Sequence, residues 1–448
     1  MKKNIFLRFW QRVCKRRSPI WRWIGLAIAA CLGTLLATIA LSQQPVTLTL
    51  LMPALDTQAG QSLVRQFEAQ NPGIRVEVVE GPNASNLVED LYTSSFLLGD
   101  TPYDLVLMDV VWLPKFAAAG WLVDLTDRIP PEQLTGFLPA DLAGGKYNGR
   151  LYRLPMRSDT GLLYYRQDLL EQAGLQPPET FEDLIKASKT LQSSGAVRWG
   201  YVWQGRQYEG LAAMFTEVLA GQGGFWVKPD TLEVGLDRPE AFQAVNFLRR
   251  TIQEGISPPG VTTYQEEEAR RLFQSGDVAF MRSWPYAYPL GSAENSPIKG
   301  LFSFKPMVHA AGADSAGCLG GWGLGIAKTS RHPEAALKVA QYFASVEGQR
   351  FSILENGYLP TRPSLYTDPA IVAKYSYFPR MQTVAEKAVL RPPVAQYAQV
   401  SDILQRYLSA ALTDRIPVEE AMRSAAEETR RLLDTKPRNP KSSNIQPG

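Results

Sequence analysis

Short apolar runs alternate with amphipathic stretches along the chain, and this order predicts strands alternating with helices. Residues 46–51 and the alternating Ile74, Val76 and Val78 predict two strands, and the apolar run 104–108 is typical of a buried parallel strand. Apolar positions at helical spacing predict helices through 63–67 and 87–98. Units of this βαβ kind build a mostly parallel sheet, so the sequence predicts an α/β fold.

The end of the third predicted strand carries two candidate ligand-binding residues. Asp109 and Trp112 come directly after the apolar run that ends at Met108. Open parallel sheets bind ligands beyond the carboxyl ends of their strands. We therefore expect Asp109 and Trp112 at the rim where a ligand binds, although Asp109 could also be a turn residue and Trp112 a wall residue.

The rest of the chain predicts helices that pack rather than carry chemistry. Helices are expected over 181–193 and 239–255, and Ser330 is placed to cap a helix with apolar positions 336–343. The strongest apolar stripe lies over 400–411. Another helix follows Pro417, with i,i+4 ion pairs between residues 419 and 423 and between 427 and 431. The polar tail 436–448 is typical of disorder.

The N-terminus predicts an export signal or a membrane anchor over residues 1–42. Eight Lys and Arg residues and no acidic residue precede position 43, and residues 23–41 contain no charge. Small residues at 40 and 42 favour cleavage before Gln43, but lipidation at Cys31 or an uncleaved anchor stays open. Because the basic flank remains inside, all three place the body in the periplasm or on the outer face of the cytoplasmic membrane.

The length and the net charge of the chain narrow the classes of protein to which it could belong. A chain of 448 residues predicts two domains or lobes. Without the eight basic residues of the leader, the net charge of +3 becomes −5. This negative charge gives no indication of a basic surface that would bind nucleic acid. Only Cys318 lies beyond the leader cysteines, so no disulfide is predicted in the body, and Cys318 is expected to be buried.

Six groups of short motifs in the body resemble, in order, those of the family 1 extracellular solute-binding proteins of ABC importers. The likeness is strongest to trehalose/maltose-type and osmolyte-binding members, and it covers about 46–433. The motifs are MDVVWL at 108–113 with AGW at 119–121, DTGLLYYR at 159–166, WQG at 203–205 with YEG at 208–210, WPY at 284–286, GGW at 320–322 and LPTR at 359–362.

This resemblance implies a two-lobed periplasmic-binding-protein fold (type II-like), with discontinuous lobes joined by hinge strands. The first lobe would take 46–156 and 306–362, and the second 157–305 and 363–435. A small carbohydrate would bind between them, and the ABC permease subunits in the cytoplasmic membrane would recognise the closed form. We expect a monomer with no cofactor, metal or nucleic-acid partner.

A sugar site needs carboxylates that accept hydrogen bonds and aromatic rings that stack on apolar C–H faces. The resemblance implies that the aspartate of the DTGLLYYR motif contacts the sugar, and a ligand position of the family also coincides with Asp109. The tryptophans of WPY and GGW lie beside Pro or Gly in predicted loops, so we expect their large rings to stack on the sugar rather than face solvent. Tyrosines could instead belong to the core, and the arginine of LPTR could form a surface ion pair. The candidate ligand-binding residues are Asp109, Trp112, Arg157, Asp159, Tyr208, Glu209, Trp284, Tyr286, Gly321, Trp322 and Arg362.

Arg157 departs from the family pattern, because sugar-binding relatives often carry an aromatic residue two positions before the aspartate. Its five N–H groups could pair with Asp159 or Glu209. The stretch 86–91 also lacks the arginine of trehalose-type proteins and carries Glu89. Both differences leave open a disaccharide such as trehalose, maltose or sucrose, or a smaller glycoside such as glucosylglycerol.

Two other functions compete with binding and transport. Asp109, Asp159 and Glu209 could supply the carboxylate pair of a glycoside hydrolase. The only histidines are His309 and His332, and no Gly-rich phosphate loop follows a strand, so the sequence favours a binding protein over an enzyme. A membrane-anchored carbohydrate-sensing ectodomain is the remaining alternative.

Overall fold

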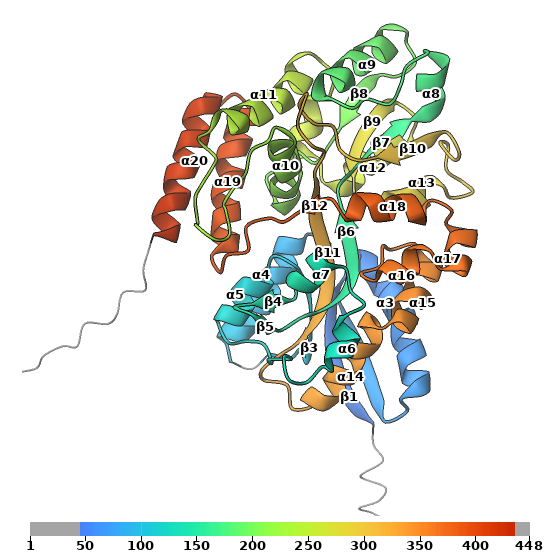
Figure 1. The fold of residues 1–448 in the computed structure, drawn as a ribbon, viewed down its shortest axis with the longest axis vertical. Helices are drawn as coiled ribbons and strands as arrows, with labels where there is room; N and C mark the ends of the chain where they lie inside the picture. The colour runs from blue at the N-terminus through green and yellow to red at the C-terminus, as the bar shows by residue number, and fades with distance from the viewer. Residues whose placement is uncertain (1–44, 100, 435–448) are drawn as a thin grey trace, which may run out of the picture.

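The computed structural model describes residues 45–99 and 101–434, which form two lobes stacked end to end (Figure 1). The predicted leader with Cys31 and the predicted disordered tail lie outside these residues. No helix within the described ranges is long and apolar enough to cross a membrane. Cys318 is buried and free, as the sequence predicted.

The first lobe is built on a sheet of order β12-β11-β3-β1-β2, with β6 on the other side of β11. β1 runs parallel to β2 and β3, which confirms the predicted βαβ units, and β11 runs antiparallel to β3. Alternate side chains such as Leu48 and Leu50 are fully buried against helices on one face. The strands are β1 Val46–Pro53, β2 Ile74–Gly81, β3 Leu105–Asp109, β6 Leu154–Thr160, β11 Gly317–Ile326 and β12 Ala388–Val389.

The second lobe has its own sheet, of order β10-β7-β9-β8. β8 is parallel to β9, whereas β7 is antiparallel to both β9 and β10. Its strands are β7 Leu162–Arg166, β8 Trp199–Val202, β9 Val278–Ser283 and β10 Phe302–Lys305, and a separate hairpin in the first lobe joins β4 Lys146–Tyr147 to β5 Arg150–Leu151.

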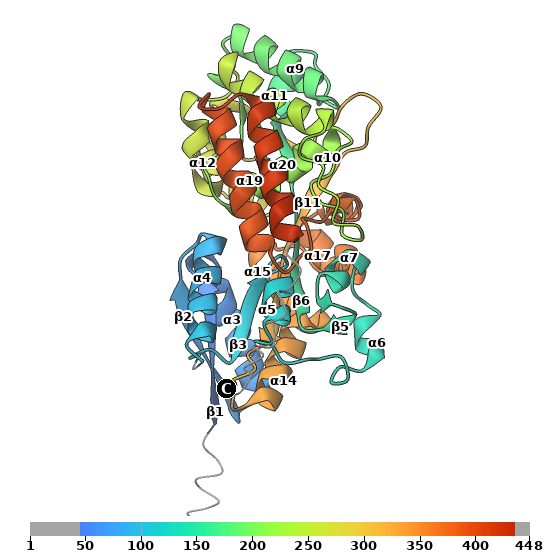
Figure 2. The same ribbon diagram turned by 90° about the vertical axis from the view of Figure 1, so that its left-hand side faces the viewer.

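Helices surround both sheets, and α19 and α20 lie side by side on the second lobe (Figure 2). The predicted ion pairs on α20 are present, and the apolar stripe of α19 is buried. The helices of the first lobe are α3 Ala54–Gln70, α4 Ser85–Leu97, α5 Leu113–Ala118, α6 Pro131–Leu134, α7 Pro139–Ala143, α14 Pro333–Ala344, α15 Val346–Asn356, α16 Pro363–Tyr366 and α17 Pro369–Lys374. Those of the second lobe and the junction are α8 Gln167–Gln172, α9 Phe181–Ser193, α10 Glu209–Gly221, α11 Pro239–Gln253, η2 Pro259–Thr263, α12 Glu266–Gln274, α13 Ala287–Gly291, α18 Phe378–Ala385, α19 Tyr397–Leu412 and α20 Val418–Leu433.

The cap predicted for α14 is wrong. The helix begins at Pro333 with His332 at the N-cap position, because the fixed φ of proline suits the first helical turn. Ser330 lies outside the helix, where its hydroxyl donates to Asp104 Oδ1 at 2.6 Å.

Two antiparallel strands, β6 and β11, connect the lobes. β6 leads directly into β7 of the second sheet, while β11 begins beside Thr160 and ends beside β3 in the first lobe. These are the hinge strands that the family resemblance implied.

The lobe boundaries differ from the expected ones in two places. Residues 306–316 pack with the second lobe, because His309 forms a β-bridge with Thr180 and the Ala310 N–H donates to the Gly221 carbonyl at 2.8 Å. The return crossing is therefore β11. Within residues 363–374, α17 packs on α15 of the first lobe, where Arg350 pairs with Asp368, and α16 packs on α17.

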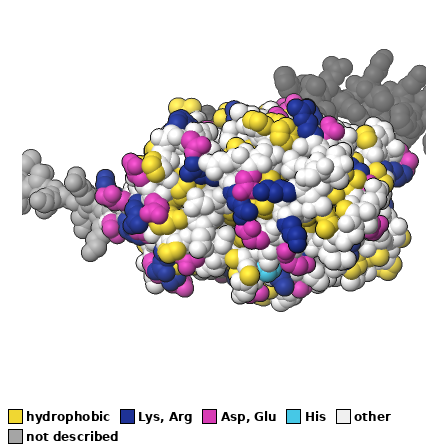
Figure 3. All heavy atoms as spheres, turned by 90° about the horizontal axis from the view of Figure 1, so that it is seen from above, with side chains coloured by type: hydrophobic (Ala, Val, Ile, Leu, Met, Phe, Trp, Pro, Cys, Tyr) yellow, Lys and Arg dark blue, Asp and Glu magenta, His cyan; other side chains and the backbone are white. Residues whose placement is uncertain are grey.

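The outer end of the second lobe carries acidic and basic side chains interspersed, with single apolar side chains among them (Figure 3). This mixture is typical of a solvated surface.

Candidate functional site

Three neighbouring strands place candidate residues in one row at the junction of the lobes. Trp322 on β11 lies opposite Asp109, the last residue of β3, and also opposite Arg157 on β6. Two positions along, Asp159 on β6 lies opposite Gly320. Because cross-strand partners share a face of a sheet, the side chains of Asp109, Trp322, Arg157 and Asp159 project to the same side.

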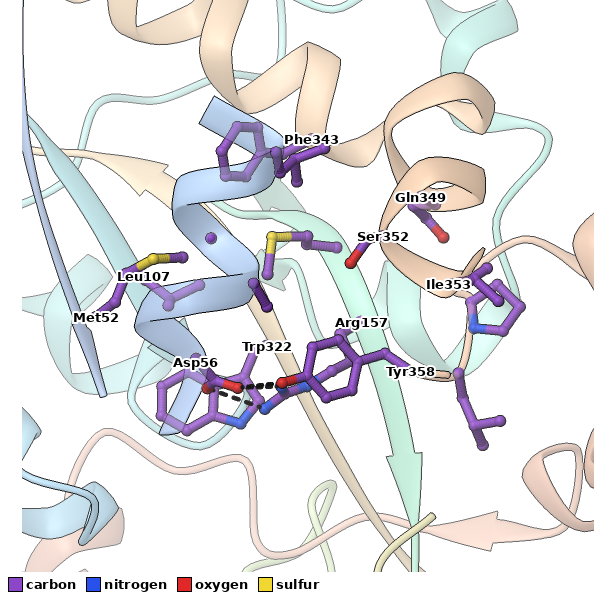
Figure 4. A pocket seen from close by; sticks show the side chains of 16 residues that line it. Met52, Asp56, Leu107, Arg157, Trp322, Phe343, Gln349, Ser352, Ile353 and Tyr358 are labelled. Atoms are coloured by element: carbon purple, nitrogen blue, oxygen red, sulfur yellow. Dashed lines mark hydrogen bonds and ion pairs between the residues drawn. The ribbon is translucent and has the colours of Figure 1, made fainter. Parts of the chain in front are cut away.

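Arg157 is enclosed by two carboxylates and two rings. Its Nη1 donates to Asp56 Oδ1 at 2.8 Å (Figure 4). Its Nε lies 3.1 Å from Asp159 Oδ2. Its guanidinium carbon lies 4.5 Å from the ring centroid of Tyr358 and 5.7 Å from that of Trp322. Tyr358 also donates its hydroxyl to Asp56 Oδ1 at 2.8 Å. The predicted pairing with Asp159 is present.

Burial raises the pKa of Asp159 to about 6, although the positive charge of Arg157 acts in the opposite direction. Because the Arg157 guanidinium is shared between Asp56 and Asp159, its attraction does not offset the free-energy cost of removing water from the Asp159 carboxylate. The cluster of Asp56, Arg157 and Asp159 therefore has spare acceptor capacity that a ligand with hydroxyl donors could use.

A second arginine, Arg391, joins the lobes. Its Nη2 lies 3.0 Å from Asp109 Oδ1 in the first lobe, and its Nη1 lies 2.6 Å from Glu209 Oε1 at the start of α10 in the second lobe. Ser401 donates to Glu209 Oε2 at 2.6 Å, and the Tyr397 hydroxyl also donates to this carboxylate. Arg157 therefore does not pair with Glu209, which was one of the two predicted partners, because Arg391 holds that position.

The second lobe contributes a wall of rings beside the first turn of α12. Trp284 Nε1 donates to Glu266 Oε1 at 3.4 Å, and the Tyr286 hydroxyl donates to Glu267 Oε1 at 3.0 Å. Tyr208 is buried nearby, and burial together with Glu266 raises the pKa of its phenol. These rings and carboxylates combine a stacking surface with hydrogen-bond acceptors.

Gly320 brings the two walls together. A Cβ at this position would lie 3.1 Å from the Cβ of Asp159 and 3.2 Å from the ring of Trp284. The absence of a side chain therefore lets an indole of the second lobe approach a carboxylate on the hinge strand.

Trp112 and Gly321 pack against the residues of the row. Trp112 is only 1% exposed, and its ring meets that of Trp322 edge-on at a centroid distance of 5.4 Å. Gly321 has φ +131°, a conformation that side chains disfavour, and its carbonyl accepts from the Val110 N–H at 3.0 Å. Trp112 thus forms part of the wall behind Trp322.

Arg362 lies apart from the other candidates. Its Nε donates to the Ala344 carbonyl at the end of α14 at 2.8 Å, and its guanidinium stacks on Phe137 at 3.9 Å. The last carbonyls of a helix have no hydrogen-bond partner within it, and Arg362 supplies a donor to one of them at the end of α14. The structure therefore does not bring Arg362 into the row.

Comparison with known proteins identifies the family. Residues 54–350 match the family model described as bacterial extracellular solute-binding protein. The chain belongs to this family. A probable ABC transporter-binding protein of Deinococcus radiodurans is 32% identical to this solute-binding protein over 355 residues, covering 78% of this chain and 84% of the relative.

Solved structures agree with this assignment. The maltose-bound MalE3 of T. maritima superposes with a TM-score of 0.82 and 37% identity over 87% of this chain and all of that one. Among relatives found by sequence, the mannitol-binding protein of Pseudomonas aeruginosa is 24% identical over 434 residues, covering 91% of this chain and 98% of the relative. The predicted two-lobed solute-binding fold is confirmed, and the family is one of binding proteins.

Proposed function

We propose that this solute-binding protein is the extracytoplasmic component of an ABC importer, where it binds a small carbohydrate between its lobes and delivers it to the membrane permease. The names of its relatives support this role, since they include an ABC transporter-binding protein, a maltose-bound protein and a mannitol-binding protein. It would act as a monomer, in the periplasm or on the outer face of the membrane, and without turning over its ligand.

The excess of carboxylates over cations at the lobe junction carries the proposal. Arg157 is shared by Asp56 and Asp159, and Arg391 is shared by two further carboxylates. Ionised carboxylates only accept hydrogen bonds, so they need donors, and sugar hydroxyls supply them. A sugar acid or a phosphate would bring more negative charge to a site that already has too much.

The rings indicate how a sugar would lie. One side of Trp322 is covered by the Arg157 guanidinium, and its ring also meets Trp112. Trp284 is partly exposed and lies beside Asp159, so it is the better platform for a sugar face. Arg157 thus favours a ligand with one stacked ring, such as a glycoside of the glucosylglycerol type, over two stacked rings of a disaccharide such as maltose, trehalose or sucrose.

The glycoside hydrolase alternative gains no support from the site. The guanidinium of Arg391 lies between Asp109 and Glu209, in the space where an acid and nucleophile pair would hold the scissile bond. A sensor ectodomain would use the same site, and only an assay of uptake in cells distinguishes it from an importer component.

Titration calorimetry of the purified protein with maltose, trehalose, sucrose, glucosylglycerol, mannitol and glucuronate tests the proposal. We expect heat of binding with at least one neutral compound and none with glucuronate. Trp284→Ala should abolish binding, whereas Trp199→Ala, a change in β8 outside the row, should leave it intact. No binding of any neutral compound, or tighter binding of glucuronate, would overturn the proposal.

A further inference from the structure

A fully buried ion pair, formed by Arg282 and Glu217, packs against Trp284. Arg282, two residues before Trp284 at the end of β9, has no exposed surface, and its Nε donates to Glu217 Oε2 at 2.8 Å. Its Nη2 also contacts the other Glu217 oxygen, and its Nη1 donates to Gln204 Oε1 at 3.1 Å. Gln204 in turn donates to the Arg282 carbonyl at 3.0 Å. The guanidinium is therefore fixed from several sides.

The guanidinium of Arg282 also covers one face of the indole. Its central carbon lies 4.0 Å from the ring centroid of Trp284, a distance typical of stacking between a planar cation and a ring. It is the sole cation or aromatic contact of Trp284 among residues 45–99 and 101–434. Arg282 contacts one face of the indole and Gly320 lies against its ring atoms. These two contacts fix the plane of the ring.

Glu217 extends this contact to the hinge strands. Its Oε1 accepts the backbone N–H of Cys318, at the beginning of β11, at 3.1 Å. Gly161, between β6 and β7, packs so closely that a Cβ there would lie 1.6 Å from the same oxygen. The ion pair thus lies where both hinge strands meet the second lobe.

We propose that Arg282 is a positioning residue for ligand binding: its guanidinium holds the indole of Trp284 in the orientation that stacks on a sugar, and Glu217 fixes this platform relative to the hinge. The inference rests on the proposed function, in which Trp284 contacts the ligand. Stability alone does not account for the pair, because an apolar pair of similar volume often fills such a space equally well. An apolar pair would not hold the indole by its face.

The test separates positioning from folding by removing both charges together. In the Arg282→Met/Glu217→Gln variant no lone charge is left buried, and the glutamine oxygen can still accept from Cys318. Arg282→Lys keeps the charge but loses the planar stack. Arg166→Met/Asp168→Asn is the matched control, since this largely buried pair begins on the neighbouring strand β7 and does not contact Trp284.

We expect the Arg282→Met/Glu217→Gln variant to bind the best neutral sugar about tenfold more weakly, with an unfolding midpoint close to that of the control. The near-ultraviolet circular dichroism of Trp284, obtained as the difference from Trp284→Phe, should be lost. Arg282→Lys should give a smaller loss of affinity. The control should change neither the affinity nor the circular dichroism of Trp284.

Wild-type affinity together with an unchanged Trp284 spectrum, in either Arg282 variant, would overturn the inference. If the double variant fails to fold, the lysine variant alone decides. Failure of the proposed function gives a different result: the wild type would then bind no neutral sugar, while the circular dichroism would still report whether Arg282 orients the indole.

Discussion

Arg391→Met removes the guanidinium that joins the lobes while keeping most of the side-chain volume. Arg391 is 3% exposed, and it contacts Asp109 of the first lobe and Glu209 of the second. The substitution leaves both carboxylates buried, at 8% exposure each, without their shared cation. The free energy of unfolding should therefore fall because two desolvated charges lose their main partner.

The size of the loss follows from the donors that remain. Removing one partner of a buried ion pair costs about 3–5 kcal/mol. Glu209 retains the hydroxyls of Tyr397 and Ser401, and Asp109 retains the Val111 N–H at 3.3 Å. With these donors still in place, we expect a loss near the lower limit, about 3 kcal/mol.

Urea unfolding of Arg391→Met beside Arg406→Met measures this difference. Arg406 on α19 also contacts two carboxylates, those of Asp402 and Glu428, but its side chain is 41% exposed. Solvent screens such pairs, so its loss should stay below about 1 kcal/mol. Added salt should reduce the Arg406 effect and leave the Arg391 effect nearly unchanged. Equal losses in the two variants would refute the reasoning.

Three further predictions concern single residues. Burial raises the pKa of Asp141 from 3.8 to about 7, so the folded state holds this proton more tightly and the wild type should lose stability as pH rises through this range. Asp141→Asn should make that slope shallower in unfolding curves measured between these pH values, and the buried Asp159 should account for part of the slope that remains. Arg362→Ala should lower the unfolding midpoint through the contact with Ala344 yet leave the dissociation constant for sugar unchanged, and weaker binding would return Arg362 to the site. Gly320→Ala should weaken binding in calorimetry more than it lowers stability, because its methyl group would press on the ring of Trp284.

The elements of the fold were predictable because their signals are local. Alternation over 46–51 and 74–78 falls within β1 and β2, the run over 104–108 matches β3 to within one residue at each end, and the helix predicted over 181–193 matches α9. Each signal depends on residues only a few positions apart. The lobe boundaries were less accurate, since residues 306–316 join the second lobe through backbone pairing with positions far earlier in the chain.

Apart from the pairing of Arg157 with Asp159, the partners in the site were not predictable, because they lie far apart in the sequence. Tyr358 and Asp56 are 302 positions apart, and Arg391 and Asp109 are 282 positions apart. Arg391 comes before two prolines in a stretch without periodicity, so nothing local marks it as a bridge between lobes. The motif around Arg362 indicated a ligand residue, but its neighbours after folding are a helix end and Phe137.

The site and the hinge are made from the same two strands, and this has a consequence for closure. Arg157 and Asp159 lie on β6, while Gly320 and Trp322 lie on β11, where the register with β6 shifts directly after Trp322. A rotation of one lobe against the other must turn these strands and so change the distances among the side chains they carry. A ligand that contacts residues on both strands and on both lobes binds best at one hinge angle, and its binding energy selects that angle. The permease would then recognise a shape that the ligand contacts themselves determine.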